Sequence, residues 1–398
     1  MARNALDGIR IMDFTWAGAG PYATLLMALF GAEVIKVENH RHLDTNRTRN
    51  PGNLENSWRF NDLNLNKMSV TMDLSVPEAR ELVTSLAQVC DVVIQNFRPG
   101  VMARLGADYA SLASRNPSVI MVSSSSRGSV GPERDYLGFA SIFSALSGLS
   151  YVTGYDDGPP VEMRLPMDFA SGVSAAMGTM VALEHRFRTG KGQHVDLASA
   201  ELPSASIGEM LMDYTMNGRV QQRKGNQDGI MAPCECYPCK GEDSWVSIAV
   251  ANDAEWKALC GVIGRRDLLK DARFADQLSR WEHRRDMDGA IGAWTVQLTP
   301  WQATERLQKA GVAAAPSCSS KDLYEDEHMK KRDMYTFVMH PVLNKQAVMN
   351  APFKLTANPS KVRRHAPLIG EHNMHVFHGL LGLPQQRVED LIERKVLY

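Results

Sequence analysis

The 398-residue sequence lacks an excess of charge of either sign. Its 44 lysines and arginines stand against 45 aspartates and glutamates, and the formal net charge of −1 is not gathered into blocks. A protein that binds nucleic acid or an anionic membrane surface usually carries a basic patch for that purpose. The sequence gives no electrostatic support to either partner, and we expect neither.

Long hydrophobic runs are also missing. The longest, Ala23–Ala32 and Ser174–Leu183, extend over about ten residues, whereas a helix needs roughly 20 apolar residues to span a bilayer. Met1–Arg10 has no basic and then apolar stretch of the kind that opens a signal peptide. We therefore expect a cytoplasmic protein without a membrane partner.

Cysteine is scarce, with six residues in the whole chain. This number excludes a disulfide scaffold, and the expected cytosolic setting favours free thiols. Cys234, Cys236 and Cys239 cluster, but a structural zinc site needs four ligands, and no second Cys or His pair follows at a suitable spacing. We expect no metal.

The composition that is present, 44% hydrophobic and 22% charged, is that of an ordinary globular protein. Segments that favour strands alternate with segments that favour helices, which indicates an α/β fold with a mostly parallel sheet and helices on both faces. The expected strands are Gly8–Phe14, Glu33–Glu38, Ser69–Leu74, Asp91–Gln95, Val119–Ser123 and Gln193–Leu197. The expected helices between them are Pro21–Gly31, Pro77–Gln88, Tyr109–Asn116 and the small-residue helix Ala170–Leu183.

The pattern changes after about residue 201, where a helical stretch without a strand partner begins. Further on, strands return at Met334–His340 and Gln346–Pro352, and the helix Pro384–Lys395 resumes the pattern of the first half. We predict a large doubly wound, Rossmann-like domain built from both chain ends, with a small α+β domain inserted. The predicted parts are 1–201 (large domain), 202–226 (linker helix), 227–320 (small domain), 321–333 (linker) and 334–398 (return to the large domain).

Asp168 is the carboxylate that stands out. It follows the turn Asp156–Pro160 and opens the helix Ala170–Leu183, which is rich in small residues and nearly free of charge. An aspartate there sits at the positive end of the helix dipole, ionised and close to packed backbone. Aspartate is also among the preferred N-cap residues, so in isolation a plain cap explains it as well.

A dinucleotide fingerprint offers a competing interpretation of the N-terminal segment. Gly18, Gly20 and Ala23 follow a predicted strand and open a predicted helix, and Glu38 ends the next strand. Pro21, however, removes a backbone N–H from the helix start, where a pyrophosphate needs donors. A hydride-transferring, NAD(P)-dependent enzyme would also leave Asp168 without a role.

Several segments, taken in order, resemble the family III CoA-transferases, the group that includes formyl-CoA and carnitine CoA-transferases. The matching segments are Leu6–Asp13, Ala19–Pro21, Gly31–Glu38, Asn96–Gly100, Arg104–Gly106, Asn116–Pro117, Asp168 with Gly172, Arg188–Gln193 and Pro367–His372. The resemblance covers nearly the whole chain in family order. It implies an interlocked dimer in which each chain threads its neighbour, either with itself or with a homologous subunit.

The resemblance also implies a role for Asp168, which occupies the position of the family's nucleophile. A carboxylate attacks an acyl-CoA thioester to give a mixed anhydride, and the released thiolate then converts the enzyme carboxyl into an enzyme–CoA thioester. An acceptor carboxylate reverses the sequence. The partners are therefore an acyl-CoA and a carboxylic acid, with CoA thioester as substrate, no permanently bound cofactor and no metal.

The family's CoA-binding positions match a further set of residues. Arg98 and Arg104 are suited to holding phosphates bidentately, although two solvated loop arginines would look the same. Asn96 and Phe97 correspond to positions that line the CoA channel, against which stand a helix cap and a core aromatic. The resemblance assigns the loop residues Trp16, Ala17, Gly18 and Ala19 to the same channel. A basic residue common in the family is replaced by Asn39, and His40, Arg41 and His42 follow it.

Departures from the oxalate-using relatives bear on the acid that is exchanged. Trp16 and Gly18 replace a His and a Gln of those relatives, and the three cysteines stand where they carry a glycine-rich lid. Oxalate is therefore a poor candidate, and Trp16 suits a larger, partly apolar acid. The Cys-Tyr-Pro-Cys-Lys-Gly stretch 236–241 resembles the succinyl-CoA:benzylsuccinate transferases of anaerobic toluene breakdown, some of which pair two homologous subunits.

Two alternatives come from other classes. Acyl-CoA racemases of the same fold need a proton-transferring His-Asp pair, but Phe139 and Ala140 stand at the matching positions and neither takes a proton. A non-catalytic partner subunit would have no need of a nucleophile, whereas Asp168 is present.

Overall fold

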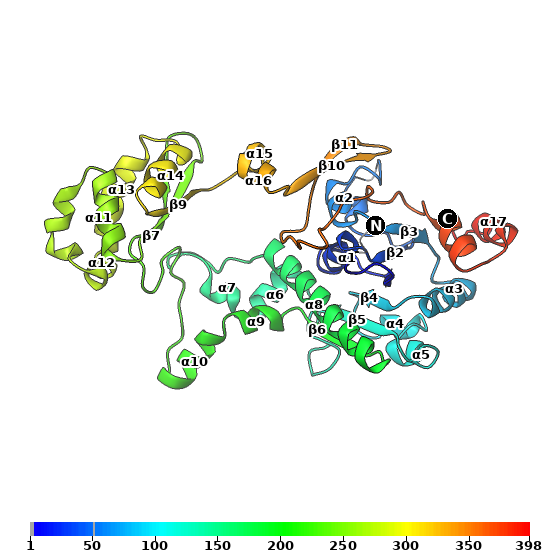
Figure 1. The fold of residues 1–398 in the computed structure, drawn as a ribbon. Helices are drawn as coiled ribbons and strands as arrows, with labels where there is room; N and C mark the ends of the chain where they lie inside the picture. Colours follow the sequence, from blue (N-terminus) through cyan, green and yellow to red (C-terminus); the bar gives the residue numbers. More distant parts are fainter. Residues whose placement is uncertain (1–3, 51) are drawn as a thin grey trace. The chain divides into compact units, whose positions relative to one another are not determined.

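The computed structural model describes residues 4–50 and 52–398, which divide into two compact units (Figure 1). The first unit takes its residues from Met1–Leu149, Glu162–Asp213 and His328–Tyr398. The second takes them from Ser150–Val161 and Tyr214–Glu327. Among the described residues, no helix is long and apolar enough to cross a membrane.

A six-stranded sheet forms the centre of the first unit, and every neighbouring pair of its strands is parallel. The strand order is β3-β2-β1-β4-β5-β6, which confirms the predicted parallel α/β sheet. Such a sheet reverses its winding between β1 and β4, and ligands of doubly wound folds bind outside the carboxyl ends of the strands at that point. The strands are β1 (Arg10–Asp13), β2 (Glu33–Glu38), β3 (Met68–Thr71), β4 (Val92–Gln95), β5 (Ile120–Ser125) and β6 (His194–Ala198).

Two separate layers cover the two faces of this sheet. On one face α1 (Ala19–Leu29) and α8 (Leu165–Thr189) pack on Ile11, Val92 and Ile120. The opposite face is covered by α3 (Pro77–Gln88), α5 (Tyr109–Ala113), the π-helix η4 (Met374–Leu380) and α17 (Gln385–Glu393). The C-terminus, which follows the red α17 in Figure 1, lies beside β3, because the backbone N–H of Tyr398 donates to Thr71 Oγ1.

The first unit also contains shorter elements around the sheet. Most of the short helices lie in the connections that follow the strands, and a hairpin packs Val348 against Leu25, Leu29 and Leu65. These elements are η1 (Arg47–Arg49), α2 (Trp58–Leu63), α4 (Val101–Arg104), α6 (Ala140–Leu146), α7 (Leu149–Val152), α9 (Glu201–Ser206), α10 (Gly208–Asn217), α16 (Glu327–Lys331), β10 (Tyr335–His340) and β11 (Asn344–Met349), some of which continue into the second unit.

The second unit has its own three-stranded antiparallel sheet and its own core. Trp256, Leu259, Phe274 and Ile291 are buried in that core. The strands are β7 (Cys234–Pro238), β8 (Trp245–Ala249) and β9 (Ala313–Pro316). The helices are α11 (Asp253–Val262), η2 (Arg266–Lys270), η3 (Ala272–Phe274), α12 (Gln277–Glu282), α13 (Arg284–Thr295), α14 (Pro300–Lys309) and α15 (Ser320–Glu325).

Several predicted boundaries are wrong. The helix expected from Ala170 begins at Leu165, because Pro166 is compatible with the first turn of a helix. The helix expected from Pro21 begins at Ala19 for the same reason. In the stretch predicted to be helical over 202–226, helix ends at Asn217.

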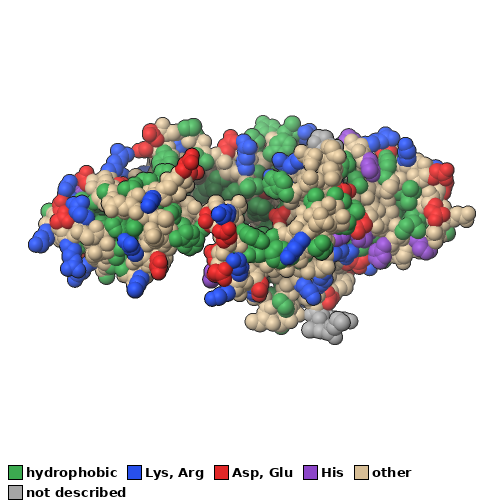
Figure 2. Space-filling model, turned by 90° about the horizontal axis from the view of Figure 1, so that it is seen from above, with side chains coloured by type: hydrophobic (Ala, Val, Ile, Leu, Met, Phe, Trp, Pro, Cys, Tyr) green, Lys and Arg blue, Asp and Glu red, His purple; other side chains and the backbone are tan. Residues whose placement is uncertain are grey.

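The surface agrees with the even charge balance of the sequence. On the face drawn in Figure 2, lysine and arginine side chains lie interspersed with aspartate and glutamate. No single-sign patch dominates that face, as expected from a net charge of −1.

Candidate active site at the switch point of the sheet

Asp168 lies inside the first turn of α8. The helix begins at Leu165, so Asp168 is its fourth residue, and the N-cap is Arg164 without a side-chain cap bond. The plain N-cap interpretation of Asp168 is therefore wrong. Its carboxylate still benefits from the positive end of the helix dipole.

Gly172 explains how Asp168 reaches the loop that follows β1. It lies one turn further along the same face of α8. A Cβ at Gly172 would stand 2.6 Å from the carbonyl oxygen of Ala19, so only glycine lets α8 approach α1 this closely. The result is a second tight contact, because a Cβ at Gly18 would stand 2.5 Å from Asp168 Oδ2.

The surroundings of Asp168 leave it partly shielded and next to one cation. Its side chain is 19% exposed, and Oδ2 lies 3.6 Å from Nη2 of Arg59 on α2. Burial raises the pKa of the Asp168 carboxyl group, and the Arg59 guanidinium acts in the opposite direction. Arg59 thus favours the ionised form, which is the form that can act as a nucleophile.

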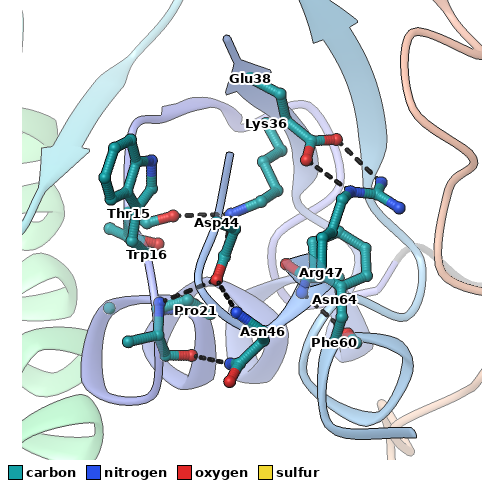
Figure 3. A network of polar contacts seen from close by, with 12 residues as sticks. Thr15, Trp16, Pro21, Lys36, Glu38, Asp44, Asn46, Arg47, Phe60 and Asn64 are labelled. Carbon is teal, nitrogen blue, oxygen red and sulfur yellow. Dashed lines mark hydrogen bonds and ion pairs between the residues drawn. The ribbon is translucent and has the colours of Figure 1, made fainter. Parts of the chain in front are cut away.

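The loop Thr15–Ala17 is held with unusual completeness. Each of the six backbone N–H and C=O groups of these three residues forms a hydrogen bond with a side chain, at 2.6 to 3.2 Å. The partners are Asp13 and Lys36 for Thr15, both amide atoms of Asn96 for Trp16, and Asp44 and Asn46 for Ala17. Figure 3 shows Lys36, Asp44 and Asn46 converging on the loop. We call this set of six hydrogen bonds the clamp. It also accommodates Ala17 at φ 61°, a left-handed conformation that a residue with a Cβ rarely adopts.

Buried ion pairs hold three of the side chains that form this clamp, Asp13, Lys36 and Asp44. Lys36 Nζ lies 3.2 Å from Asp44 Oδ2, and Lys67 Nζ lies 3.3 Å from Asp13 Oδ2, with all four side chains almost fully buried. Burial lowers the pKa of Lys67 to about 8, against the influence of Asp13. These residues were not predicted from the sequence, although a lysine between the apolar residues Val34, Ile35 and Val37 of a strand is a signal that could have pointed to them.

Asn96 and Phe97 bring the end of β4 to the loop that follows β1. Besides the two Asn96 bonds, the rings of Trp16 and Phe97 meet edge to face with centroids 5.4 Å apart. These contacts lie where the winding of the sheet reverses, between β1 and β4. The predicted residues Trp16, Phe97 and Asn96 therefore lie together. Gly18, two residues after Trp16, lies against the Asp168 carboxylate.

Arg98 and Arg104 are near in sequence to Asn96 but are not tied to Asp168. Both are exposed, and within the described part of the chain neither forms an ion pair. Arg104 lies on α4, whose N-cap Gly100 has the left-handed φ of 80°. Two exposed cations without a carboxylate partner leave their charge available to an anion.

The dinucleotide interpretation meets a physical obstacle at both glycines of the fingerprint. The second glycine, here Gly20, should let a pyrophosphate approach the backbone, but a Cβ at Gly20 would stand 2.4 Å from Thr15 Cβ. The Asp168 carboxylate fills the space beside the first glycine, Gly18, and its charge would repel a phosphate. The racemase alternative needs a His-Asp pair that transfers a proton. Phe139 and Ala140, at the matching positions, form the start of α6, and neither side chain can take a proton.

The three clustered cysteines Cys234, Cys236 and Cys239 lie on β7 and directly after it. Among residues 4–50 and 52–398, no group of three or more His, Cys, Asp or Glu side chains is arranged to hold a metal ion. Burial raises the pKa of the Cys234 and Cys239 thiols, which disfavours the thiolate that a metal would need.

The clamp gives a first prediction. Asn96→Ala leaves the N–H and C=O of Trp16 without their partners, and an unsatisfied buried group costs about 1–3 kcal/mol. We expect a lower free energy of unfolding in urea and a reduced turnover. Asn116→Ala is the control, since Asn116 precedes the amino end of β5, whereas the loop Thr15–Ala17 follows the carboxyl end of β1. Equal stability and equal turnover in Asn96→Ala and wild type would contradict the clamp.

Known proteins of similar sequence and fold identify the class of enzyme to which this doubly wound chain belongs. A model described as CoA-transferase family III matches residues 6–373. The succinyl-CoA–D-citramalate CoA-transferase of Chloroflexus aurantiacus is 34% identical over 395 residues, which covers 98% of each chain. The β subunit of succinyl-CoA–L-malate CoA-transferase from the same organism is 30% identical over 396 residues, again 98% of each chain.

A solved structure agrees with these relatives. The crystal structure of a CAIB/BAIF family protein from Brucella suis matches with a TM-score of 0.87 and 29% identity, covering 95% of this chain and 100% of that one. The chain belongs to CoA-transferase family III, which confirms the resemblance drawn from its motifs.

Proposed function

We propose that the chain transfers CoA from an acyl-CoA to a carboxylic acid with Asp168 as the nucleophile. The observation that carries this proposal is the position of Asp168, packed on Gly18 and paired with Arg59. The clamped loop Thr15–Ala17 supports it, because a site that must hold two acids in turn gains rate from a rigid frame.

The chemistry proceeds in two exchanges of acyl groups. An Asp168 oxygen attacks the acyl carbon, the C–S bond breaks, and CoA leaves as a thiolate. The thiolate then attacks Cγ of Asp168, so that the donor acid leaves and an aspartyl–CoA thioester remains. An acceptor carboxylate reverses both steps. Shielding from water protects the anhydride, in keeping with the 19% exposure of Asp168.

We propose succinyl-CoA as the donor and an aromatic-substituted dicarboxylate such as benzylsuccinate as the acceptor. The names of two relatives contain succinyl-CoA, which supports the donor. The half-buried Trp16 against Phe97 supports an acceptor with an aromatic substituent. D-citramalate and L-malate are the competing acceptors, since those relatives are named for them.

One experiment tests the proposal. Purified protein is incubated with succinyl-CoA and each of the three acids, CoA esters are identified by mass spectrometry, and intact protein is weighed. We expect benzylsuccinyl-CoA as product and a protein heavier by one CoA less one water after succinyl-CoA alone. Product formation without any covalent adduct under quenched conditions would contradict the aspartyl intermediate.

Arg98 and Arg104 are proposed to hold the phosphates of CoA, with Phe97 and the loop Trp16–Ala19 lining the channel. Replacing either arginine with alanine should weaken CoA binding by about 1.5–3 kcal/mol, or roughly 10- to 150-fold. Calorimetric titration with CoA and with dephospho-CoA measures the loss and locates the 3′-phosphate. The exposed Arg115, which precedes the amino end of β5, provides the control Arg115→Ala. Unchanged affinity in both variants would remove the assignment.

A further inference from the structure

Arg59 is the cation that lies beside Asp168 in the candidate active site, and it was not among the residues predicted from the sequence. It belongs to α2, a six-residue helix capped by Ser57, whose side chain accepts from the N–H of Phe60. The helix is anchored next to Arg59, because Phe60 is fully buried and stacks under the Arg47 guanidinium at 3.6 Å (Figure 3). The Arg59 side chain itself is 22% exposed, so a fixed helix presents it to the space beside Asp168.

The charge that Arg59 faces cannot stay on Asp168 during the proposed reaction. When Asp168 attacks an acyl-CoA, its carboxylate becomes one half of a neutral anhydride, and the electron pair leaves on the CoA sulfur. When the thiolate then attacks Cγ, the bond from Cγ to the bridging oxygen breaks and the pair leaves on the donor acid. The bridging oxygen is an original oxygen of Asp168, so the released carboxylate carries it away.

The negative charge therefore passes from Asp168 to the released acid but stays close to Arg59. When the anhydride breaks, the carboxylate of the released acid still lies next to Asp168, whose Oδ2 is 3.6 Å from Arg59. The acceptor carboxylate must occupy the same position to attack the aspartyl thioester. A single guanidinium can pair with Asp168 and with both acids in turn.

We propose that Arg59 is the shared counter-ion of the reaction: it pairs with Asp168 in the resting enzyme and with the exchanging carboxylic acid while Asp168 is bound to CoA. This role rests on the proposed function of Asp168. Arg59 binds the carboxylate common to donor and acceptor, which leaves the choice between acids to the residues around the rest of each molecule.

The covalent enzyme–CoA thioester allows a direct test. It is prepared with succinyl-CoA from wild type, Arg59→Gln, Arg59→Lys and the control Arg115→Gln, freed of small molecules, and mixed with either succinate or hydroxylamine. Both reagents attack the same carbonyl, but only succinate brings a negative charge. The loss of the adduct mass is followed over time.

We expect the Arg59→Gln adduct to react with succinate roughly 10- to 100-fold more slowly than wild type, because a charge-assisted contact is lost. Its reaction with hydroxylamine should match wild type, and Arg59→Lys should recover most of the rate with succinate. An equal rate with succinate in Arg59→Gln and wild type would overturn the proposal. Equal slowing with both reagents would also overturn it, since Arg59 would then merely shape the site.

A pH profile of adduct formation gives a second readout. Because Arg59 lowers the pKa of Asp168, its removal should move the acid limb of the profile to higher pH in Arg59→Gln alone. Burial raises the pKa of the neighbouring Asp62 on α2 as well, but this group and Tyr22 of α1 are the same in every variant. An unmoved acid limb would count against the ion pair. If wild type forms no adduct at all, the proposed function fails, which is distinct from a wild-type adduct that is indifferent to Arg59.

Discussion

Asp168→Ala should abolish CoA transfer, with a loss of at least roughly a thousandfold, and should form no covalent adduct with acyl-CoA. Removing a nucleophile commonly costs several powers of ten, because the alternative route must use water or direct attack. The measurements are the rate of acyl exchange and the intact mass after incubation with succinyl-CoA. Residual activity above about a hundredth of wild type would exclude the covalent role.

The same substitution should not weaken the fold. Burial raises the pKa of Asp168, so its ionised form is less favourable in the folded state than in the unfolded chain. This unfavourable contribution is present above the raised pKa and disappears as the pH falls through it. We therefore expect the Tm of Asp168→Ala at neutral pH to equal or exceed that of wild type.

A matched control separates catalysis from general effects of removing a carboxylate. Glu81 is exposed on α3, which covers the other face of the sheet. Glu81→Gln should keep full activity and the covalent adduct. A drop in activity in Glu81→Gln that equals that of Asp168→Ala would point to a shared cause such as impaired folding.

Local patterns were sufficient for much of the fold. The strand Glu33–Glu38 and the helix Pro77–Gln88 were predicted to the residue, because apolar periodicity and a proline at the helix start mark them within their own segments. The start of α8 was misplaced, since the helix was expected only from Ala170, whereas it begins at Leu165 with Pro166 in its first turn, where a helix tolerates proline.

The parts of the candidate site that were missed are those made by tertiary contacts. The clamp on Thr15–Ala17 draws side chains from β1, β2, the loop after β2 and the end of β4, which no local pattern connects. Arg59 was missed because α2 has only six residues, and so short a helix does not show a periodicity that reveals which side chain faces α8. Asp168 was found because a resemblance along the whole chain singled out the position.

An apolar stripe on α8 bears on the proposed dimer. Val173, Met177 and Val181 follow one another at intervals of about one helical turn and so lie on one face of α8. They are 50%, 67% and 59% exposed. The other side of α8, with the buried Ala175 and Ala182, already packs on the sheet. A row of exposed apolar side chains along a long helix is typical of an interface rather than of a solvated surface.

We propose that this stripe is part of the interface of an interlocked dimer, formed with a second copy or with a homologous subunit. Segments 202–226 and 321–333 were predicted as linkers. They contain most of α9, all of α10 and α16 and most of α15, and would carry the chain around a neighbour as short helices joined by turns.

Met177→Glu should therefore destroy the assembly. It places a carboxylate in the middle of the stripe, and burying an unpaired charge costs several kcal/mol per ion, enough to raise a dissociation constant more than a hundredfold. Light scattering on micromolar protein should give a dimer for wild type and a monomer or insoluble protein for Met177→Glu. The control Gln88→Glu, at an exposed position of α3, should remain dimeric. A well-folded wild-type monomer would refute the interlocked dimer, a Met177→Glu dimer would place the interface elsewhere, and a chain that is soluble only when co-expressed with a homologue would favour the heteromeric form.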